Sequence, residues 1–158
     1  MAYAIRPFRT DDASALAELT LDAIKAVGAK SYSTEQVDVW AARHPGPKRF
    51  LERAQGGSMM FVAVDADDKP VAYSLLEPDG HLDMLYCHPD HTRRGLADEL
   101  LAAAEQKAQA LGISRLFTEA SELARPSFER AGYTVERRRD FNLDGVSIHN
   151  YAMEKRLT

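Results

Sequence analysis

Cysteine is almost absent from this sequence. The single residue of this type, Cys87, has no partner for an internal disulfide in a chain of 158 residues. A secretion signal is also missing, because residues 1–12 contain no long apolar run. No other stretch approaches the ~20 apolar residues of a membrane span. These absences predict a protein of the reducing cytoplasm without a membrane partner.

An excess of positive charge is missing as well. The chain has 20 Lys and Arg residues against 24 Asp and Glu residues, which gives a formal net charge of −4. A general nucleic-acid binder needs a basic face that neutralises phosphates, so we expect no nucleic-acid partner. With 45% hydrophobic and 28% charged residues the composition is that of an ordinary folded protein, and the length predicts a single domain over residues 1–158.

Common nucleotide and metal motifs are missing too. The chain contains neither the G-x-x-x-x-G-K-[ST] loop of triphosphate sites nor the G-x-G-x-x-G turn of dinucleotide sites. Cys87, His88 and His91 lie close together, but no second Cys/His pair follows at a spacing suited to zinc. We therefore expect no metal, and we expect the Cys87 thiol to fill core space.

The pattern of apolar residues predicts a chain that mixes strands and helices. Residues 10–28 and 96–112 have apolar side chains at helical spacing, and the second segment has an apolar face that runs from Leu96 to Leu111. The other predicted elements are strands at 2–8, in three runs within 58–87, and at 113–120, 133–143 and 146–157, with shorter helices at 33–43, 48–54 and 124–132.

Local signals predict how some of these elements start and pair. Thr10 or Asp11 can cap the first long helix, and Ser33 with Gln36 three residues later has the spacing of a capping box. The strand, helix and strand around residues 82–119 should form a parallel pair within an otherwise antiparallel sheet. The fold class is therefore α/β of the α+β type.

The segment "HPDHTRRGLADELL", residues 88–101, places a glycine and two arginines where a strand gives way to a helix. A helix N-terminus exposes unpaired N–H groups and about half a positive charge, so it attracts phosphate. Gly95 and Ala97 would let a ligand's oxygens approach the main chain, and Arg93 and Arg94 add charge. The alternative is that Gly95 only allows a turn.

The longer segment "LYCHPDHTRRGLADELL" resembles the acyl-CoA-binding segment of the GNAT superfamily of N-acetyltransferases, whose pattern is [QR]-x-x-G-x-[GA]. Gly95 and Ala97 match the last two fixed positions, whereas Thr92 stands where Gln or Arg is usual. Further similar segments occur in the family's order and extend the resemblance to nearly the whole chain: "IRPFRTDDASALAEL", "ASELARPSFERAGY" and "HNYAMEKRL".

This resemblance implies a GNAT-like fold and acetyl-CoA as cosubstrate. The fold would have a mixed, mostly antiparallel sheet of six or seven strands, about four flanking helices, and a parallel pair that splays apart to admit the pantetheine arm. The arm would bind along a strand, and the diphosphate would bind at the helix N-terminus. The cofactor-binding residues implied are Leu85, Tyr86, Cys87, Arg93, Arg94, Gly95, Leu96, Ala97, Asp98 and Phe128.

The resemblance also implies direct transfer of an acetyl group to a primary amine, for which a nearby base is useful. In the histone-type branch of the family a Glu lies four residues before the matching Cys, and Asp83 falls on that position. Asp83 lies in a mostly apolar strand that could bury it, or it could be exposed or paired with Arg. Glu77 and His81 are alternative bases, directly or through a water.

The acid that protonates the departing thiolate is uncertain from the sequence. The family often uses a Tyr in its later helix, and the corresponding position here is Phe128, which cannot donate a proton. Either the thiolate leaves without help, or Tyr133 or Tyr151 supplies the proton.

The acceptor pocket of the family is formed partly by the helical segment between the first two strands. Tyr32 and Trp40 lie in that segment and would line the pocket, as would His81 and His149, although aromatic side chains there could equally be core. The acceptor itself would be a small-molecule or peptide amine.

Two other interpretations stay open. A catalytically weak acyl-CoA-binding sensor or interaction domain would keep the phosphate cradle, and Phe128 is compatible with it. A small α/β module without a coenzyme would bind no CoA. An exposed edge strand would also allow a homodimer.

Overall fold

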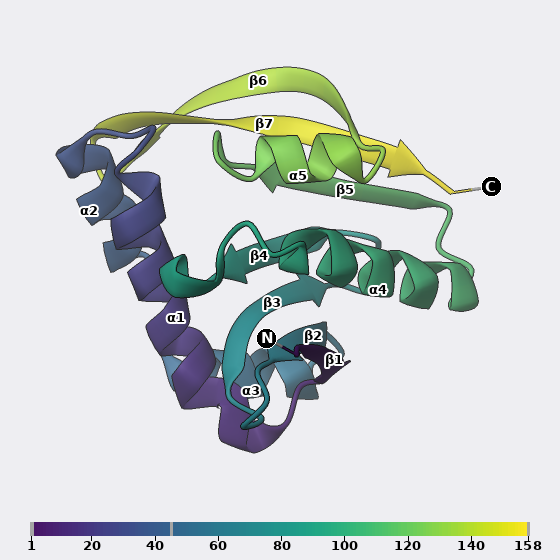
Figure 1. Ribbon diagram of the computed structural model, residues 1–158. Helices are drawn as coiled ribbons and strands as arrows, with labels where there is room; N and C mark the ends of the chain where they lie inside the picture. The colour runs from purple at the N-terminus through teal and green to yellow at the C-terminus, as the bar shows by residue number, and fades with distance from the viewer. Residues whose placement is uncertain (1, 45, 158) are drawn as a thin grey trace.

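The computed structural model describes residues 2–44 and 46–157, and within them it has seven strands, five α-helices and two short 3-10 helices (Figure 1). The order agrees with the order predicted from the sequence. The elements are β1 (Ala4–Pro7), η1 (Thr10–Asp12), α1 (Ala13–Gly28), α2 (Thr34–Ala42), α3 (Pro47–Gln55), β2 (Met59–Val64), β3 (Pro70–Leu76), β4 (Leu82–Cys87), η2 (Pro89–His91), α4 (Leu96–Ala110), β5 (Arg115–Ala120), α5 (Arg125–Arg130), β6 (Thr134–Leu143) and β7 (Val146–Arg156).

The strands form two sheets, and the expected splayed parallel pair, β4 and β5, lies where the two sheets meet. One has the order β1-β2-β3-β4 and the other the order β5-β7-β6, and every pair within each sheet is antiparallel. The predicted parallel pair, β4 with β5, is reduced in the described residues to one isolated bridge between His81 and Phe117. The two sheets therefore meet at a single point and separate beyond it.

A β-bulge at Asp83 accompanies this separation. Leu76 of β3 pairs with Leu82 of β4, whereas the next residue, Leu75, pairs with Met84, so Asp83 is an extra residue in β4. A bulge bends its strand and increases the local twist. It follows directly on the point where β4 and β5 touch, so we attribute the divergence of β4 to this extra residue.

Two hydrogen bonds join the β4 and β5 segments just before the bulge. The Phe117 N–H donates to the Gly80 carbonyl at 3.1 Å, and the buried Thr118 hydroxyl donates to the Leu82 carbonyl at 2.7 Å. Past these contacts β4 and β5 are edge strands of separate sheets. The result is a wedge-shaped gap that is closed at one end.

Helices cover both sheets around the gap. In Figure 1, α1 and α2 stand together at one end of the molecule, where α1 contacts β3 and β4 and α2 contacts β7. Helix α4 packs on β2, β3 and β4, and it buries Leu100, Leu101 and Ala104. Leu111, predicted to continue this face, is 52% exposed because α4 ends at Ala110.

Helix starts follow local chemistry with one difference from the prediction. The Ser33 hydroxyl accepts from the Gln36 N–H at 3.1 Å, and the Gln36 side-chain oxygen accepts from the Ser33 N–H at 2.9 Å, which is the expected capping box. Ahead of α1, however, neither Thr10 nor Asp11 is the cap. The buried Asp12 carboxylate accepts from the Arg9 N–H at 2.8 Å instead.

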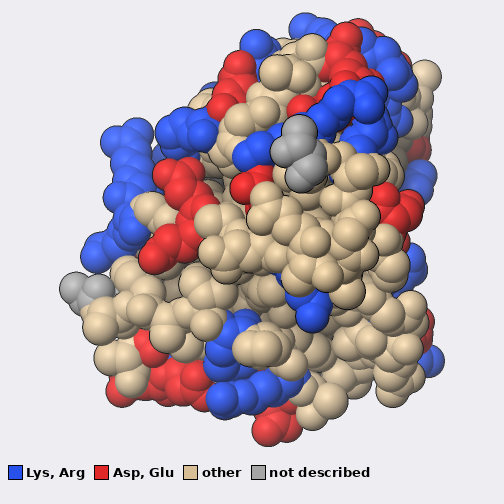
Figure 2. Space-filling model, turned by 90° about the vertical axis from the view of Figure 1, so that its right-hand side faces the viewer, with Lys and Arg blue, Asp and Glu red and all other residues tan. Residues whose placement is uncertain are grey.

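The surface carries charges of both signs. Figure 2 shows Lys and Arg atoms next to Asp and Glu atoms over the upper part of the face that it presents. Ion pairs such as Arg115 with Glu154 at 2.5 Å and with Glu136 at 3.1 Å join charges of opposite sign in the described residues. No helix in the described part of the chain has the length and apolar character needed to cross a bilayer.

Replacement of Gly80 tests how much the contact between the strands at the closed end of the gap contributes to stability. A Cβ at this position would lie 2.1 Å from the Arg115 carbonyl oxygen, and φ is +98°. We expect Gly80→Ala to lower the free energy of unfolding by about 3 kcal/mol or more, because steric overlap adds to backbone strain. Gly145→Ala is the matched control, since its φ is +83° and its Cβ would meet open space, and it should cost about 1–2 kcal/mol. Equal losses in urea unfolding would contradict this role of Gly80.

Candidate active site

Two cavities lie along the gap between the sheets in the part of the chain that the structure describes. The larger has a volume of about 540 Å³ and the smaller about 140 Å³. The residues that line both cavities are Trp40, Leu85, Tyr86, Ser121 and Ala124. The cavities therefore adjoin each other where β4 and the segment after β5 stand apart.

The larger cavity reaches the N-terminus of α4. Gly95 is the N-cap residue, has φ +77° and provides no side-chain cap, so the first-turn N–H groups lack that partner. A Cβ on Gly95 would meet open space. The predicted phosphate cradle is thus an open helix end at a cavity. Of the predicted cofactor-binding residues, the following line this cavity: Leu85, Tyr86, Cys87, Arg93, Gly95, Leu96, Ala97 and Asp98.

Two residues of that prediction lie elsewhere. Arg94 is exposed and belongs to the lining of neither cavity, whereas Phe128 is buried and lines the smaller cavity. Two basic residues that sequence reasoning missed, Lys30 and Arg130, line the larger cavity. The signal was weak, since Arg130 is simply one arginine within the segment "ASELARPSFERAGY". It contacts Asp98 at 3.1 Å and thereby links α5 to the first turn of α4.

The smaller cavity has aromatic and polar walls. Tyr32 and Trp40, both predicted there, line it with edge-on rings 5.5 Å apart. The Tyr32 hydroxyl also accepts from the Glu122 N–H at 2.8 Å and donates to the His149 carbonyl at 3.1 Å. Tyr32 therefore links the segment after β5 to β7, and it also forms part of the wall of the smaller cavity.

His149, also predicted at this pocket, lines the smaller cavity from β7. Its Nε2 lies 2.6 Å from a Glu122 carboxylate oxygen, and the Tyr151 hydroxyl donates to the same oxygen at 2.8 Å. These two contacts, first the one from His149, lower the pKa of Glu122. A histidine oriented by an ionised carboxylate therefore faces the cavity.

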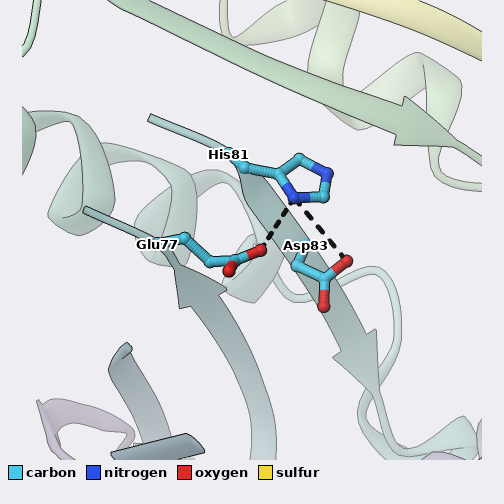
Figure 3. Close-up of side chains that lie close together, drawn as sticks. All are labelled: Glu77, His81 and Asp83. Atoms are coloured by element: carbon cyan, nitrogen blue, oxygen red, sulfur yellow. Dashed lines mark hydrogen bonds and ion pairs between the residues drawn. The ribbon is translucent and has the colours of Figure 1, made fainter. Parts of the chain in front are cut away.

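His81 lies at the closed end of the gap and lines neither cavity. Its Nδ1 is 2.8 Å from Glu77 and 3.9 Å from Asp83, as Figure 3 shows, and its Nε2 is 2.8 Å from Glu119 of β5. The ring stacks on Phe117. Hydrogen bonds that His81 donates to Glu119 and then to Glu77, opposed by burial, raise the pKa of His81 to about 9. His81 is thus a cation that ties β4 to β5.

Arg53 of α3 supplies a second cation to this network. It contacts Asp83 at 2.8 Å and Glu77 at 3.5 Å. The Asp83 side chain is 30% exposed and lines the smaller cavity, whereas Glu77 lines neither cavity. Asp83 is therefore ion-paired with Arg53 instead of being buried among apolar residues.

Glu77, His81 and Asp83 also have the donor types of a metal site, with ligand atoms within 4.8 Å of one another. A metal ion needs a free lone pair on histidine. His81 is held protonated between two carboxylates, and Arg53 already compensates Asp83. The arrangement fits an ion-pair network better than a metal centre.

Tyr133, predicted as an acid, lies away from both cavities. Its hydroxyl is buried without a hydrogen-bond partner among the described residues, and its ring stands edge-on to Phe128 at 5.0 Å. Burial raises the pKa of Tyr133. The hydroxyl of Tyr151, the other tyrosine considered, donates a hydrogen bond to Glu122. Tyr133 thus contributes to the packing behind Phe128.

Comparisons with known proteins agree with this geometry. A family model described as an acetyltransferase (GNAT) domain matches residues 28–155. The uncharacterized N-acetyltransferase YafP of Escherichia coli (strain K12) is 27% identical over 149 residues, which cover 94% of this chain and 93% of that protein. The crystal structure of a GCN5-related N-acetyltransferase from Rhodopseudomonas palustris is 32% identical, with a TM-score of 0.88 and coverage of 99% of this chain and 97% of the other. The PaiA N-acetyltransferase from Thermoplasma acidophilum, in complex with coenzyme A, is 21% identical, with a TM-score of 0.80 and coverage of 99% and 100%.

The His81 network should make stability depend on pH in a defined direction. Because the pKa of His81 is raised from 6.5 to about 9 by folding, its contribution is complete below pH 6.5 and is lost as the pH rises through 9. The full linkage value would be about 3 kcal/mol, and solvent screening reduces our expectation to about 1–2 kcal/mol. Between pH 6.5 and 9, the wild type should lose that much more stability than His81→Gln in urea unfolding. Glu119→Gln should show part of the effect, and parallel pH curves for all three proteins would contradict it.

Proposed function

The chain belongs to the GNAT acetyltransferase family, and from this premise we propose that it transfers the acetyl group of acetyl-CoA directly to a primary amine. The observation that carries the proposal is the junction of the two cavities at Trp40, Leu85, Tyr86, Ser121 and Ala124. A thioester at that junction would have its CoA part in the larger cavity and its acyl carbon open to the smaller one. One ligand in each cavity is the arrangement that direct transfer requires.

The larger cavity suits coenzyme A in its chemistry. Residues 85–87 lie beyond the bulge, where β4 has no strand partner on the β5 side, so their main-chain groups can bind the amides of pantetheine like an added strand. The open N-terminus at Gly95 suits the diphosphate. Lys30, Arg93 and Arg130 supply positive charge for phosphate groups.

The smaller cavity suits a compact cationic acceptor. Its lining includes the carboxylates of Asp83 and Glu119 and, within the described residues, no Lys or Arg. Aromatic rings from Tyr32, Trp40 and Tyr86 can pack on an alkyl or aryl group and on the ammonium itself. We therefore propose a small primary amine without an acidic group of its own.

In the reaction, the unprotonated amine attacks the thioester carbonyl carbon. A C–N bond forms and the C–S bond breaks, and its electron pair leaves with sulfur as the CoA thiolate. The residue at the position of the family's usual acid, Phe128, lines the smaller cavity with a ring that has no proton to give. The thiolate therefore leaves unaided or takes its proton from another group at the junction.

Phe128 also favours a second candidate function. An acyl-CoA-binding sensor or interaction domain would keep the larger cavity and need no acid. In this case the smaller cavity would have no acceptor to hold, although its carboxylates and aromatic walls are those of a binding pocket.

An assay of thiol release from acetyl-CoA over a panel of small amines tests the proposed function. We expect the wild type to acetylate at least one amine without an acidic group, with the N-acetyl product identified by mass spectrometry. Amino acids should be poorer acceptors, because their carboxylate would face Asp83 and Glu119. Saturable binding of CoA without any product would establish the sensor, and the absence of a thermal shift with CoA would exclude both functions.

A pair of glycine variants in α4 tests the diphosphate cradle. Gly95 and Gly112 stand at opposite ends of the helix with φ of +77° and +75°, and a Cβ on either would meet open space. Both alanine substitutions should cost about 1 kcal/mol of stability. Only Gly95→Ala should weaken CoA binding, by about 10-fold or more, because its methyl group stands where the phosphates approach. Calorimetric titration with CoA checks this, and equal affinities for the two variants would refute the cradle.

A further inference from the structure

Of the five histidines, His149 lines the smaller cavity and His91 the larger one. His149 comes from the middle of β7, opposite the bulged strand β4. Its carboxylate partner, Glu122, follows β5, so the pair spans two segments that also bound the gap. Neither member of this pair belongs to the residues proposed above for CoA.

The contacts of Glu122 determine which nitrogen of His149 can exchange a proton. The carboxylate is ionised, since His149 and Tyr151 lower its pKa, and an ionised carboxylate can only accept hydrogen bonds. The Nε2 atom, 2.6 Å from Glu122, must therefore carry a hydrogen. This leaves Nδ1 as the atom with the available lone pair when the ring is neutral.

The Nδ1 atom is accessible. It has no hydrogen-bond partner among the described residues. It is also not fully buried, unlike His44 Nδ1 and the Tyr133 hydroxyl, which are buried without a partner. The His149 side chain is 17% exposed. Its ring is held by Tyr32 at 5.5 Å and, edge-on, by Tyr151 at 5.7 Å. A fixed ring with an open nitrogen thus stands in the cavity wall.

The other candidate bases, Asp83 and His81, are already paired with charged groups. Asp83 pairs with Arg53 at 2.8 Å, so its carboxylate already has a cationic partner. His81 is a cation between Glu119 and Glu77 and has no lone pair to offer. These groups hold the closed end of the gap together.

We propose that His149 is the catalytic base of the acceptor pocket, with Glu122 and Tyr151 as positioning residues that fix its ring. The proposal rests on the proposed acetyl transfer. The acceptor enters as an ammonium, and Nδ1 takes one proton to free the lone pair that attacks the thioester. The second proton leaves the nitrogen as the C–S bond breaks and ends on the CoA thiolate. His149 then returns its proton to water, so that one ammonium and one acetyl-CoA give one amide, one CoA thiol and one released proton.

The rate should accordingly fall at low pH, where the ring is already protonated. The ionisable groups near His149 in the described residues are Glu122 after β5 with Arg125 of α5 near it, Tyr32 before α2, Asp140 and Arg138 on β6, Tyr151 on its own strand, and Asp83 and Glu119 on the lining of the same cavity. Arg138 pairs with Asp140 at 3.1 Å and Asp83 with Arg53 at 2.8 Å, whereas Glu122 is the charge in direct contact with the ring. Loss of that charge should shift the acid limb of the rate profile to lower pH.

Matched variants test the proposal with the amine that the wild type turns over best. We expect His149→Gln to lower kcat/KM about 100-fold or more, with the affinity for CoA within about twofold of the wild type. Glu122→Gln should lower kcat/KM about 10-fold and shift the acid limb, as a positioning role requires. Glu18→Gln, the same change at an exposed position of α1, should leave both unchanged.

Four outcomes decide the matter. Restoration of activity to His149→Ala by added imidazole would support the base role even if the other variants lost stability. A wild type that acetylates amines alongside an equally active His149→Gln, or a loss in Asp83→Asn greater than in His149→Gln, would overturn this inference alone. A wild type that binds CoA but acetylates no amine would overturn the proposed function and this inference together.

Discussion

The whole arrangement depends on a short contact between two strands that belong to different sheets. Gly80 and Leu82 offer carbonyl oxygens to Phe117 and Thr118, and directly afterwards the extra residue Asp83 bends β4 away. Without the contact, β4 and β5 would not be joined to each other. Without the bend, the two strands would continue to pair and would leave no gap between the sheets. The two cavities exist because hydrogen bonding between β4 and β5 is strong at one end and stops within a few residues.

Histidine has opposite roles at the two ends of this gap. At the closed end, carboxylates on both ring nitrogens keep His81 charged, and the charge serves to hold strands together. At the smaller cavity, Glu122 contacts one nitrogen of His149, and the other has no hydrogen-bond partner among the described residues. The number of carboxylate partners, more than burial, distinguishes a histidine that stabilises from one that can exchange protons.

Sequence patterns predicted the elements and the uncapped helix start at Gly95 because both depend on neighbours in the chain. The capping box of Ser33 and the helix start at Gly95 are set by a few adjacent residues. The bulge was not predictable, since "LDMLYC" is mostly apolar like a regular strand and the extra residue shows only against β3. The exposure of Leu111 likewise depends on where α4 stops, and a helical face extended by periodicity overshoots that point.

The sequence pointed to several residues that line the smaller cavity, but not to the partners that these residues contact. The resemblance drew attention to Asp83, Phe128 and His149, and all three line the smaller cavity. The partners that decide their chemistry come from distant segments: Arg53 is 30 positions from Asp83 and Glu122 is 27 positions from His149. Such pairings depend on tertiary packing, which single-sequence periodicity does not encode.

The divergence of β4 leaves a row of main-chain donors and acceptors that no strand satisfies, and an open row of this kind normally invites other chains to attach and aggregate. Here the row faces inward, with Ile24 of α1, Trp40 of α2 and Leu96 of α4 standing around the same cavity. The fold therefore keeps the unpaired main-chain groups of β4 inside a cavity, where a second polypeptide sheet has no room to pair with them.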